Sequence, residues 1–509
     1  MYRSLTTFAL VGLEPMRVRV EASIRRGTPM VRIVGMPPGA ALQCVERIRA
    51  AAGRAGLTIP GLRITVNLAP ADLPKSGAAF DLPILIAVLA AAGHVPVEAL
   101  TGLAAIGELG LDGGIRPVRG VLPVTLRCAA DAAVHSLIVP QANLREAATA
   151  DDVVVRGAVS LTQVIAYLSG GPDLPRTSPS PHRGGSNGRP SEPDLAEVQG
   201  QVVARRVLEI AAAGGHHVLL LGEPGVGKTM LARRLPGLLP PLTPEEAVEA
   251  SIVHSVAGLL DPADGLLAVR PFRAPHHLVT AVGLVGGGSQ LRPGEASLAH
   301  RGVLFLDELG EFRPGVLDAL RQPLETGTMR LVRATGAVTL PAAFQLVAAM
   351  NGCPCGYVTS GASSCVCSEW QIRRYFRTVS GPLLDRIDMI HEMAGGEWSA
   401  LDGSPGESSA TVARRVAAAR RFRLARGQPE PNAALDLTRQ RLYCRPDDEG
   451  AVLLVQAARQ SRLSMRVCHR VLRVARTIAD LAESAAVRAP HVLEALAHRR
   501  RAGEFRPAG

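Results

Sequence analysis

The sequence has no apolar run long enough to cross a membrane. Its longest, residues 82–93, is about a dozen residues, whereas a membrane-spanning helix needs about 20. The first residues, MYRSLTTFALVG, also lack the apolar core and the cleavage site of a signal peptide. These absences argue against a membrane-spanning protein and predict a cytoplasmic location with no membrane partner.

Cysteine is scarce, with 8 in 509 residues, and thiols stay reduced in the cytoplasm, which argues against a disulfide framework. Four of the eight nevertheless lie within MNGCPCGYVTSGASSCVCSEW, residues 350–370, as two C-x-C pairs. Four thiolates suffice for a closed tetrahedral site, so the sequence predicts structural zinc. The predicted ligands are Cys353, Cys355, Cys365 and Cys367. A one-residue spacer is less usual than two, so reduced packing cysteines and a redox sensor are the alternatives.

Lysine is almost absent, because 54 of the 56 basic residues are arginine and only Lys75 and Lys228 are lysine. The net charge of +11 is concentrated at one end. Residues 411–509 carry 20 arginines and 9 acidic residues, whereas residues 1–410 carry 36 basic and 36 acidic residues. A local arginine excess predicts a polyanionic partner such as nucleic acid. The alternative is a solvated helical face in an arginine-biased sequence.

The chain is longer than one hydrophobic core usually organises, so several domains are expected. A run rich in proline, serine and glycine at 172–193 predicts a flexible linker, and a second break is expected at 396–410. Before the first linker, at 1–171, β-like runs alternate with alanine-rich helical patterns. Apolar strands dominate 194–395, and helical periodicity dominates 411–509. The predicted fold class is therefore a multidomain α/β protein with an α+β N-terminal domain and an all-α end.

A phosphate-binding loop is predicted in LLLGEPGVGKTMLARRL, residues 219–235, which reads as a strand, a glycine-rich loop and a helix. It matches G-x-x-x-x-G-K-[ST], whose backbone N–H groups and helix N-terminus bind phosphate oxygens. Lys228 is predicted to reach the β and γ phosphates of ATP, and Thr229 to bind Mg²⁺. The full set of predicted nucleotide-binding positions is Gly222, Glu223, Pro224, Gly225, Val226, Gly227, Lys228 and Thr229.

A second apolar strand, in GVLFLDEL at 302–309, ends in two carboxylates about 75 residues after this loop. Asp307 is predicted to hold the Mg²⁺ shell. Glu308 is predicted to orient or deprotonate the attacking water. Together with the glycine-rich loop, these carboxylates predict hydrolysis of a nucleoside triphosphate.

Longer motifs accompany this site: PFRAPHH at 271–277, a glycine-rich stretch at 286–309 that ends in Asp-Glu-Leu, and SGPLLDRID at 380–388. Together they resemble the YifB/ComM-type AAA+ ATPases, which are related to the ATPase subunits of magnesium chelatase. RITVNLAPADLPKSGAAFDLPI at 63–84 is similar to the N-terminal domain of that family, and LSMRVCHRVLRVARTIADL at 463–481 to its C-terminal lid. The linker at 172–193 is not part of the resemblance. The family is expected to have proline after the asparagine at position 351, where this sequence has Gly352.

The resemblance implies an AAA+ core that assembles into a ring, expected to be a hexamer, and roles for three further residues. Asn351 would position the water, Arg386 would act as an arginine finger on a neighbouring subunit, and Arg466 would be a second sensor on the lid. The alternatives are a capping or turn role for Asn351, a surface salt bridge from Arg386 to Asp385 or Asp388, and an ordinary surface arginine at position 466.

The N-terminal domain resembles the Lon-protease type of the S5 fold, so peptidase activity has to be considered. Such proteases use a serine in a glycine-rich turn and a lysine from a following helix. The matching stretch, PKSGAAFDLP, has alanine and phenylalanine near the nucleophile position. Ser76 and Lys75 are sequence neighbours, which seldom converge as a dyad. We therefore expect no protease dyad.

Three functions follow as hypotheses. The first is a ring motor on single-stranded or branched DNA, similar to ComM in driving branch migration. The others are a nucleotide-dependent remodeller of protein complexes and a chelatase-type ATPase, which would need a partner chelating subunit. For the motor, GTMRLVRATGAVTLP at 327–341 predicts a hairpin that brings Arg330 and Arg333 to DNA near a turn at Gly336. The alternative is an edge hairpin with solvated arginines.

Overall fold

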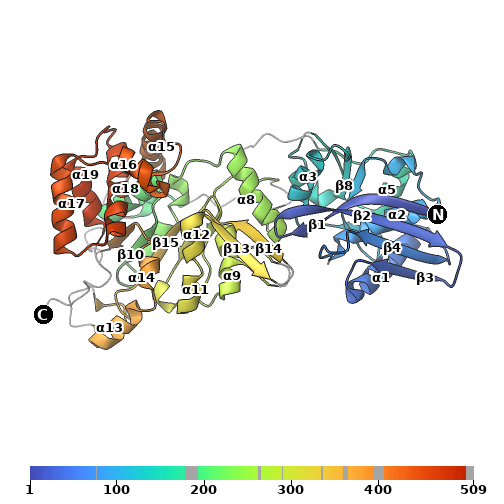
Figure 1. Ribbon diagram of the computed structural model, residues 1–509, viewed down its shortest axis with the longest axis horizontal. Coiled ribbons are helices and arrows are strands. Elements are labelled where there is room, and N and C mark those ends of the chain that lie inside the picture. Colours follow the sequence, from blue (N-terminus) through green and yellow to red (C-terminus); the bar gives the residue numbers. More distant parts are fainter. Residues whose placement is uncertain are drawn as a thin grey trace.

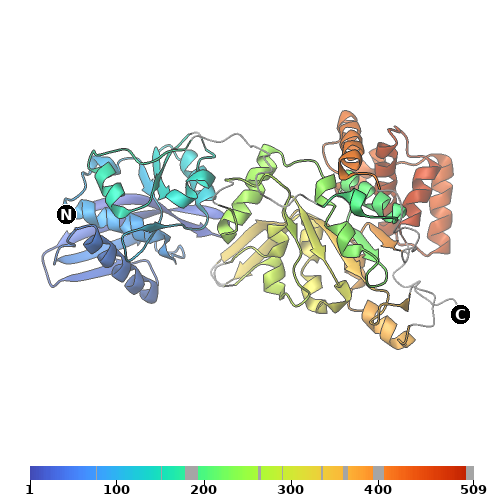
Figure 2. The same ribbon diagram turned by 180° about the vertical axis from the view of Figure 1, so that it is seen from behind.

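The protein consists of three parts arranged along its long axis, as the computed structural model shows (Figure 1, Figure 2). The described residues are 1–75, 77–150, 152–177, 193–261, 265–288, 291–333, 336–358, 365–393 and 406–499. Most of the predicted linker at 172–193, most of the predicted break at 396–410, and Ser76 lie outside these ranges. Within them, no helix has the length and apolar character needed to span a bilayer.

The N-terminal part is a mixed seven-stranded sheet covered by helices. Its strands, in spatial order, are β3 (Met30–Val34), β4 (Arg63–Ala69), β2 (Glu14–Arg25), β1 (Tyr2–Val11), β5 (Leu103–Ala105), β8 (Ser136–Pro140) and β9 (Val154–Ala158). Val18 and Val20 of β2 are buried on alternate positions of one face, against helix α2 (Asp81–Ala92). Every residue of α2 up to Ala91 is buried, so this helix forms the centre of the N-terminal core.

The other elements of this part are α1 (Pro38–Arg54), β6 (Glu108–Leu109), β7 (Ile115–Arg116), α3 (Val121–Ala129), α4 (Leu144–Ala147) and α5 (Leu161–Leu168). The buried charged groups of this part include Asp81 and Lys75, and both have hydrogen-bond partners. Asp81 at the start of α2 accepts two hydrogen bonds from Arg47, at 2.5 and 3.0 Å. The ammonium of Lys75 is buried and donates to the carbonyls of Pro70 and Leu73. This lysine therefore ties a loop together instead of facing solvent.

The central part contains a five-stranded parallel sheet. The strands, in spatial order, are β11 (Phe272–Arg273), β12 (Val303–Leu306), β15 (Gln345–Met350), β10 (Val218–Leu221) and β16 (Met389–Glu392). The two strands predicted at the nucleotide site, β10 and β12, are present and fully buried, and β15 is fully buried as well. Because β15 lies between β10 and β12, the residues that follow these three strands meet at one edge of the sheet.

The helices of the central part are α6 (Val202–Gly214), α7 (Lys228–Ala232), α8 (Pro244–Ala257), α9 (Ala281–Val285), α10 (Glu295–Leu298), α11 (Pro314–Asp318), α12 (Arg321–Thr326), α13 (Glu369–Phe376) and α14 (Gly381–Leu384). The predicted hairpin is confirmed: β13 (Thr328–Arg333) pairs antiparallel with β14 (Gly336–Pro341). It lies beside the end of β1 (Figure 1), where Leu331 and Val338 pack with Val11 at the end of β1 and Leu13 in the turn that follows. One face of the hairpin is thus covered by the N-terminal part.

The C-terminal part is all-helical, as predicted, with α15 (Ser409–Ala425), α16 (Leu437–Tyr443), α17 (Asp448–Gln460), α18 (Met465–Leu481) and α19 (Ala489–Ala497). Helices α15 and α18 pack on α6, and their apolar residues belong to the same core as β10. Several arginines of this part point inward. Arg476 is only 1% exposed and pairs with Asp480, which also binds Arg426. Part of the C-terminal arginine excess is therefore structural.

Candidate nucleotide site

The predicted phosphate-binding loop joins β10 to α7 at the edge of the central sheet. Gly222, Gly225 and Gly227 have φ angles of 156°, 80° and 96°. These are backbone conformations that residues with a Cβ rarely adopt, so the glycines let the chain curl round a phosphate. Helix α7 ends at Ala232 after five residues and is shorter than the sequence pattern predicts.

Lys228 points back into this loop and is buried. Its ammonium donates to the carbonyls of Gly222 and Glu223, both at 2.8 Å, and to Oδ1 of Asn351 at 2.9 Å. Burial lowers the pKa of Lys228 from its ordinary value, and nearby acidic groups oppose this shift. The lysine thus links the phosphate-binding loop to the residue that follows β15.

Thr229 and Asp307 meet across the gap between the loop and β12. The Thr229 hydroxyl donates to Oδ2 of Asp307 at 2.6 Å, and the backbone N–H of Glu308 donates to Oδ1 of Asp307 at 3.0 Å. A hydroxyl and a carboxylate in contact are the hard oxygen ligands that Mg²⁺ takes in nucleotide sites. The two predicted magnesium ligands, Thr229 and Asp307, are therefore in direct contact with each other.

Glu308 has a left-handed backbone, with φ of 51°, which is uncommon for a residue with a side chain. Its carboxylate Oε2 lies 3.1 Å from Nδ1 of His277 in the segment after β11. The His277 ring lies 4.1 Å from the His276 ring and meets the edge of Phe312 at 6.5 Å, both measured between centroids. Strained backbone conformations are concentrated at functional sites, and here the strain falls on the predicted catalytic carboxylate.

Asn351 follows β15 and lies between the loop and the acidic strand, as its contact with Lys228 shows. Behind it, the Tyr375 side chain of α13 is buried close to Gly310, where any side chain would collide with the tyrosine ring. Burial raises the pKa of the Tyr375 hydroxyl, which faces the backbone of Asn351. Tyr375 thus packs α13 against both Asn351 and the turn after Glu308.

Two predicted residues are not part of this cluster. Arg386, just after α14, forms an ion pair with Glu325 of α12 and donates to the carbonyl of Pro382 at 2.7 Å. The sequence alternative of a bridge to Asp388 is wrong, because Asp388 is buried and pairs with Arg470 at 2.7 Å. The second is the predicted sensor on the lid, Arg466, which is exposed in the first turn of α18.

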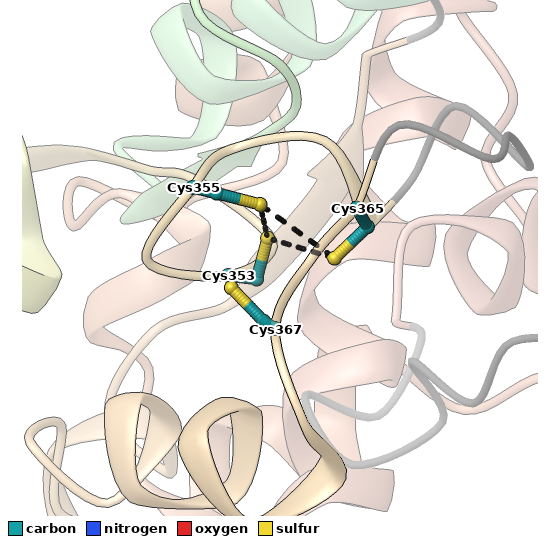
Figure 3. Close-up of side chains that lie close together, drawn as sticks. All are labelled: Cys353, Cys355, Cys365 and Cys367. Carbon is teal, nitrogen blue, oxygen red and sulfur yellow. Dashed lines mark hydrogen bonds between the residues drawn. The ribbon is translucent and has the colours of Figure 1, made fainter.

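The four predicted zinc ligands do come together. The residues Cys353, Cys355, Cys365 and Cys367 form what we call the cysteine cluster. Their sulfur atoms all lie within 4.8 Å of one another and point toward a common centre (Figure 3). The clustering expected from the two C-x-C pairs is therefore confirmed.

His277 and Tyr375 were not identified as site residues from the sequence. His277 belongs to PFRAPHH, so two adjacent histidines after a short strand were the available signal. Tyr375 is buried in α13, whose exposed residues are a mixture of charged, polar and aromatic side chains, and no pattern in the sequence distinguishes it as a contact of Asn351.

The arrangement fits ATP with Mg²⁺. A lysine for phosphate, a hydroxyl–carboxylate pair for the cation, and a second carboxylate beside an amide lie at the ends of three adjacent parallel strands. The ligand would sit outside the carboxyl ends of the strands, which is where open α/β sheets bind ligands.

Three family models match successive stretches of the chain. They are described as "Subunit ChlI of Mg-chelatase" at residues 20–143, "Magnesium chelatase, subunit ChlI" at 194–401, and "Magnesium chelatase, subunit ChlI C-terminal" at 406–499. The second of these contains the whole candidate site. This chain is also similar over a shorter stretch to the magnesium-chelatase 67 kDa subunit of Heliobacterium mobile. The two are 29% identical, with 30% of this chain and 27% of the other covered.

Similarity to three bacterial proteins extends over nearly the whole chain. The uncharacterized protein Rv2897c of Mycobacterium tuberculosis is 44% identical, and 93% of this chain and 94% of the other are covered. Competence protein ComM of Haemophilus influenzae is 42% identical, with 96% of each chain covered. Protein YifB of Escherichia coli is 41% identical, with 97% and 96% covered. With this identity along the whole length, the chain belongs to the YifB/ComM family of magnesium-chelatase-like AAA+ proteins.

Proposed function

We propose that this protein hydrolyses ATP at the edge of its central sheet. The observation that carries the proposal is the contact of Lys228 with Asn351 beside the contact of Thr229 with Asp307. Lys228 and the loop amides bind the phosphates, and Thr229 with Asp307 holds Mg²⁺, which neutralises developing phosphate charge when bound. Glu308 accepts the proton of the attacking water, and Asn351 orients that water.

We further propose that ATP hydrolysis drives movement of single-stranded or branched DNA through a ring of subunits, with six as the expected number. The solvent-facing arginines of the hairpin and of the C-terminal helices support a phosphate-binding surface. The C-terminal set consists of Arg414, Arg421, Arg439, Arg441, Arg445, Arg459, Arg462, Arg466 and Arg488. The H. influenzae relative carries a competence name, which agrees with a role in DNA processing. Such a motor would act in the cytoplasm.

In the same proposal the N-terminal part is a Lon-like S5 fold used for binding instead of peptide hydrolysis. The burial of Lys75 and its bonds to two carbonyls support this, because a general base must reach the nucleophile it activates. Its contact with the hairpin suggests that it supports the DNA-binding element.

The decisive experiment is the ATPase rate with and without forked DNA. A DNA motor is expected to hydrolyse ATP several-fold faster when DNA is present, at low salt. An unchanged rate, together with no DNA binding, would favour the protein-remodelling function. Stimulation by a chelating partner subunit instead of DNA would favour the chelatase-type function.

His277 is expected to position Glu308. Because hydrogen bonds to charged groups contribute about 1.5–3 kcal/mol, His277→Ala should lower kcat about tenfold or more. The KM for ATP should stay nearly constant, since His277 contacts no phosphate-binding residue in the described structure. His277→Asn, which keeps a hydrogen-bonding group, should restore much of the rate. His276→Ala is the matched control, and an equal loss in that variant would assign the effect to packing.

The hairpin arginines are expected to couple ATP hydrolysis to DNA movement. Arg330 and Arg333 are both exposed, whereas Leu331 between them is buried against the N-terminal part. Arg330→Ala with Arg333→Ala should leave basal hydrolysis intact and abolish displacement of branched DNA. Each lost phosphate contact should also lower the slope of log affinity against log salt by about 0.7 to 0.9.

The control for this double variant removes two arginines elsewhere. Arg49→Ala with Arg54→Ala, on the exposed side of α1, changes the net charge by the same amount. If both double variants migrate branched DNA as well as the wild type does, the hairpin is not the DNA-coupling element.

A further inference from the structure

The cysteine cluster has the geometry of a metal centre. Three of its sulfur separations are 3.3 Å for Cys353–Cys355, 3.7 Å for Cys353–Cys365 and 3.6 Å for Cys355–Cys365. Four sulfurs placed tetrahedrally at the Zn–S distance of about 2.3 Å lie about 3.8 Å apart. Cys353, Cys355 and Cys365 are thus spaced close to one face of such a tetrahedron, and the sulfur of Cys367 lies within 4.8 Å of all three.

The donor set favours a thiophilic ion such as zinc over Mg²⁺ or Ca²⁺. All four donors are sulfur, whereas Mg²⁺ and Ca²⁺ take oxygen ligands. The sulfur of Cys355 also accepts hydrogen bonds from the backbone N–H groups of Tyr357 and Val366. Backbone donors of this kind stabilise the negative charge of a metal-bound thiolate. The other four cysteines, at 44, 128, 444 and 468, are buried elsewhere and belong to no metal-ligand group among the described residues.

The cluster also touches the nucleotide site. Cys353 lies two residues after Asn351, at the end of β15. Gly356, with φ of 93°, lies so close to the phosphate-binding loop that a Cβ there would be 2.6 Å from the ring of Pro224. On its other side, Cys367 leads into α13, which starts with a Ser368 capping box and carries Tyr375. The loop of the cluster is therefore packed between the phosphate-binding loop and the helix behind Asn351.

We propose that the cysteine cluster binds one zinc ion and that this zinc holds the loop after Asn351 against Pro224, which fixes the phosphate-binding loop for ATP. The loop that carries the cysteine cluster has few apolar residues. Four zinc–sulfur bonds would therefore stabilise it in place of a hydrophobic core. The part of this proposal that concerns ATP rests on the proposed ATPase function, whereas the zinc site does not.

The first test is the metal content of the full-length protein, purified without added metal. About one zinc per chain is expected by elemental analysis. Cys365→Ser with Cys367→Ser should lose it, and Cys468→Ser, in α18, should keep it. Titration of the wild type with a mercurial in the presence of a zinc dye should release the same one equivalent, which keeps the test independent of how the variants fold. Addition of a strong zinc chelator should lower the melting temperature by about 5 °C or more.

The second test asks whether the contact of Gly356 with Pro224 affects ATP binding while zinc stays bound. Gly356→Ala removes no thiol but pushes the loop away from Pro224, so zinc should stay bound while the KM for ATP rises several-fold. Gly427→Ala is the matched control, because Gly427 also has a positive φ, of 80°, but nothing within 4 Å of its would-be Cβ. An unchanged KM in Gly356→Ala would overturn the coupling.

The outcomes are distinguishable. Metal-free protein with four reactive thiols, a disulfide detected by intact mass, or iron in place of zinc would each overturn the zinc assignment and leave the ATPase proposal standing. Stoichiometric zinc in a protein that neither binds nor hydrolyses ATP would overturn the proposed function and leave the zinc site in place.

Discussion

Replacing Glu308 with glutamine should stop ATP turnover while leaving ATP binding intact. In the proposed reaction this carboxylate accepts the proton of the attacking water, and an amide of the same size cannot do so. General acid–base catalysis contributes about 10²–10⁴-fold to a rate, so kcat should fall by about that factor. Affinity should stay within about twofold, because the phosphate contacts come from the loop and Lys228. Single-turnover hydrolysis and binding of a fluorescent ATP analogue measure the two quantities.

Two control variants test whether the loss of turnover is specific to Glu308. Glu311→Gln removes an exposed carboxylate three residues further along the chain and should hydrolyse ATP like the wild type. Lys228→Ala should lose binding as well as turnover, since its ammonium is the only lysine charge in the loop. Turnover by Glu308→Gln at the wild-type rate would contradict the assignment of the water-activating residue.

Local patterns in the sequence were sufficient for much of the candidate site. The glycine-rich loop, the apolar strands β10 and β12 and the hairpin at 328–341 each depend on neighbouring residues, so periodicity and turn chemistry reveal them. The convergence of the cysteine cluster could also be predicted, because two C-x-C pairs joined by a short loop have few ways to lie far apart.

Contacts between distant segments could not be predicted in this way. Glu308 meets His277 from a different strand, and Gly356 meets Pro224 across more than a hundred residues, so both depend on the order of strands in the sheet. The burial of β1 does not alternate cleanly along the strand, so its place in the N-terminal sheet between β2 and β5 could not be predicted from periodicity.

The arginine-rich end shows a different limit of sequence reasoning. Composition alone cannot separate arginines that face solvent from those that pair inside the fold. Arg470 binds buried Asp388, and Arg499 donates to the carbonyl of Ile387, so both join the C-terminal helices to the segment that carries Arg386. The charge available to a polyanion is therefore smaller than the net excess implies, and the position of the lid is tied to the predicted arginine finger.

The predicted arginine finger, Arg386, is held by a carboxylate of its own chain in the structure. Arg386 pairs with Glu325, and its side chain is only 12% exposed. To act on a neighbouring subunit, Arg386 has to leave Glu325 and contact the γ-phosphate of the ATP bound to that subunit. Glu325 would then bind Arg386 only while the finger is not engaged with ATP, so Glu325→Gln should keep most of the ATPase activity. If the ion pair has only a structural role, Glu325→Gln and Arg386→Ala should instead be equally impaired.

Arg386→Ala should lower kcat about 10³-fold or more, because an arginine finger contributes 10³–10⁵ to phosphoryl transfer. The defect should be complemented by Lys228→Ala protein, which lacks a working nucleotide site but supplies an intact finger. In randomly mixed rings at equal concentrations, about a quarter of the interfaces combine an intact site with an intact finger, so up to about a quarter of wild-type activity should return. Mixed assembly is verified by pull-down of one tagged variant with the other. With mixed rings confirmed, an absence of rescue would place the action of Arg386 within one subunit, because a residue that serves its own nucleotide site cannot be replaced by a neighbour.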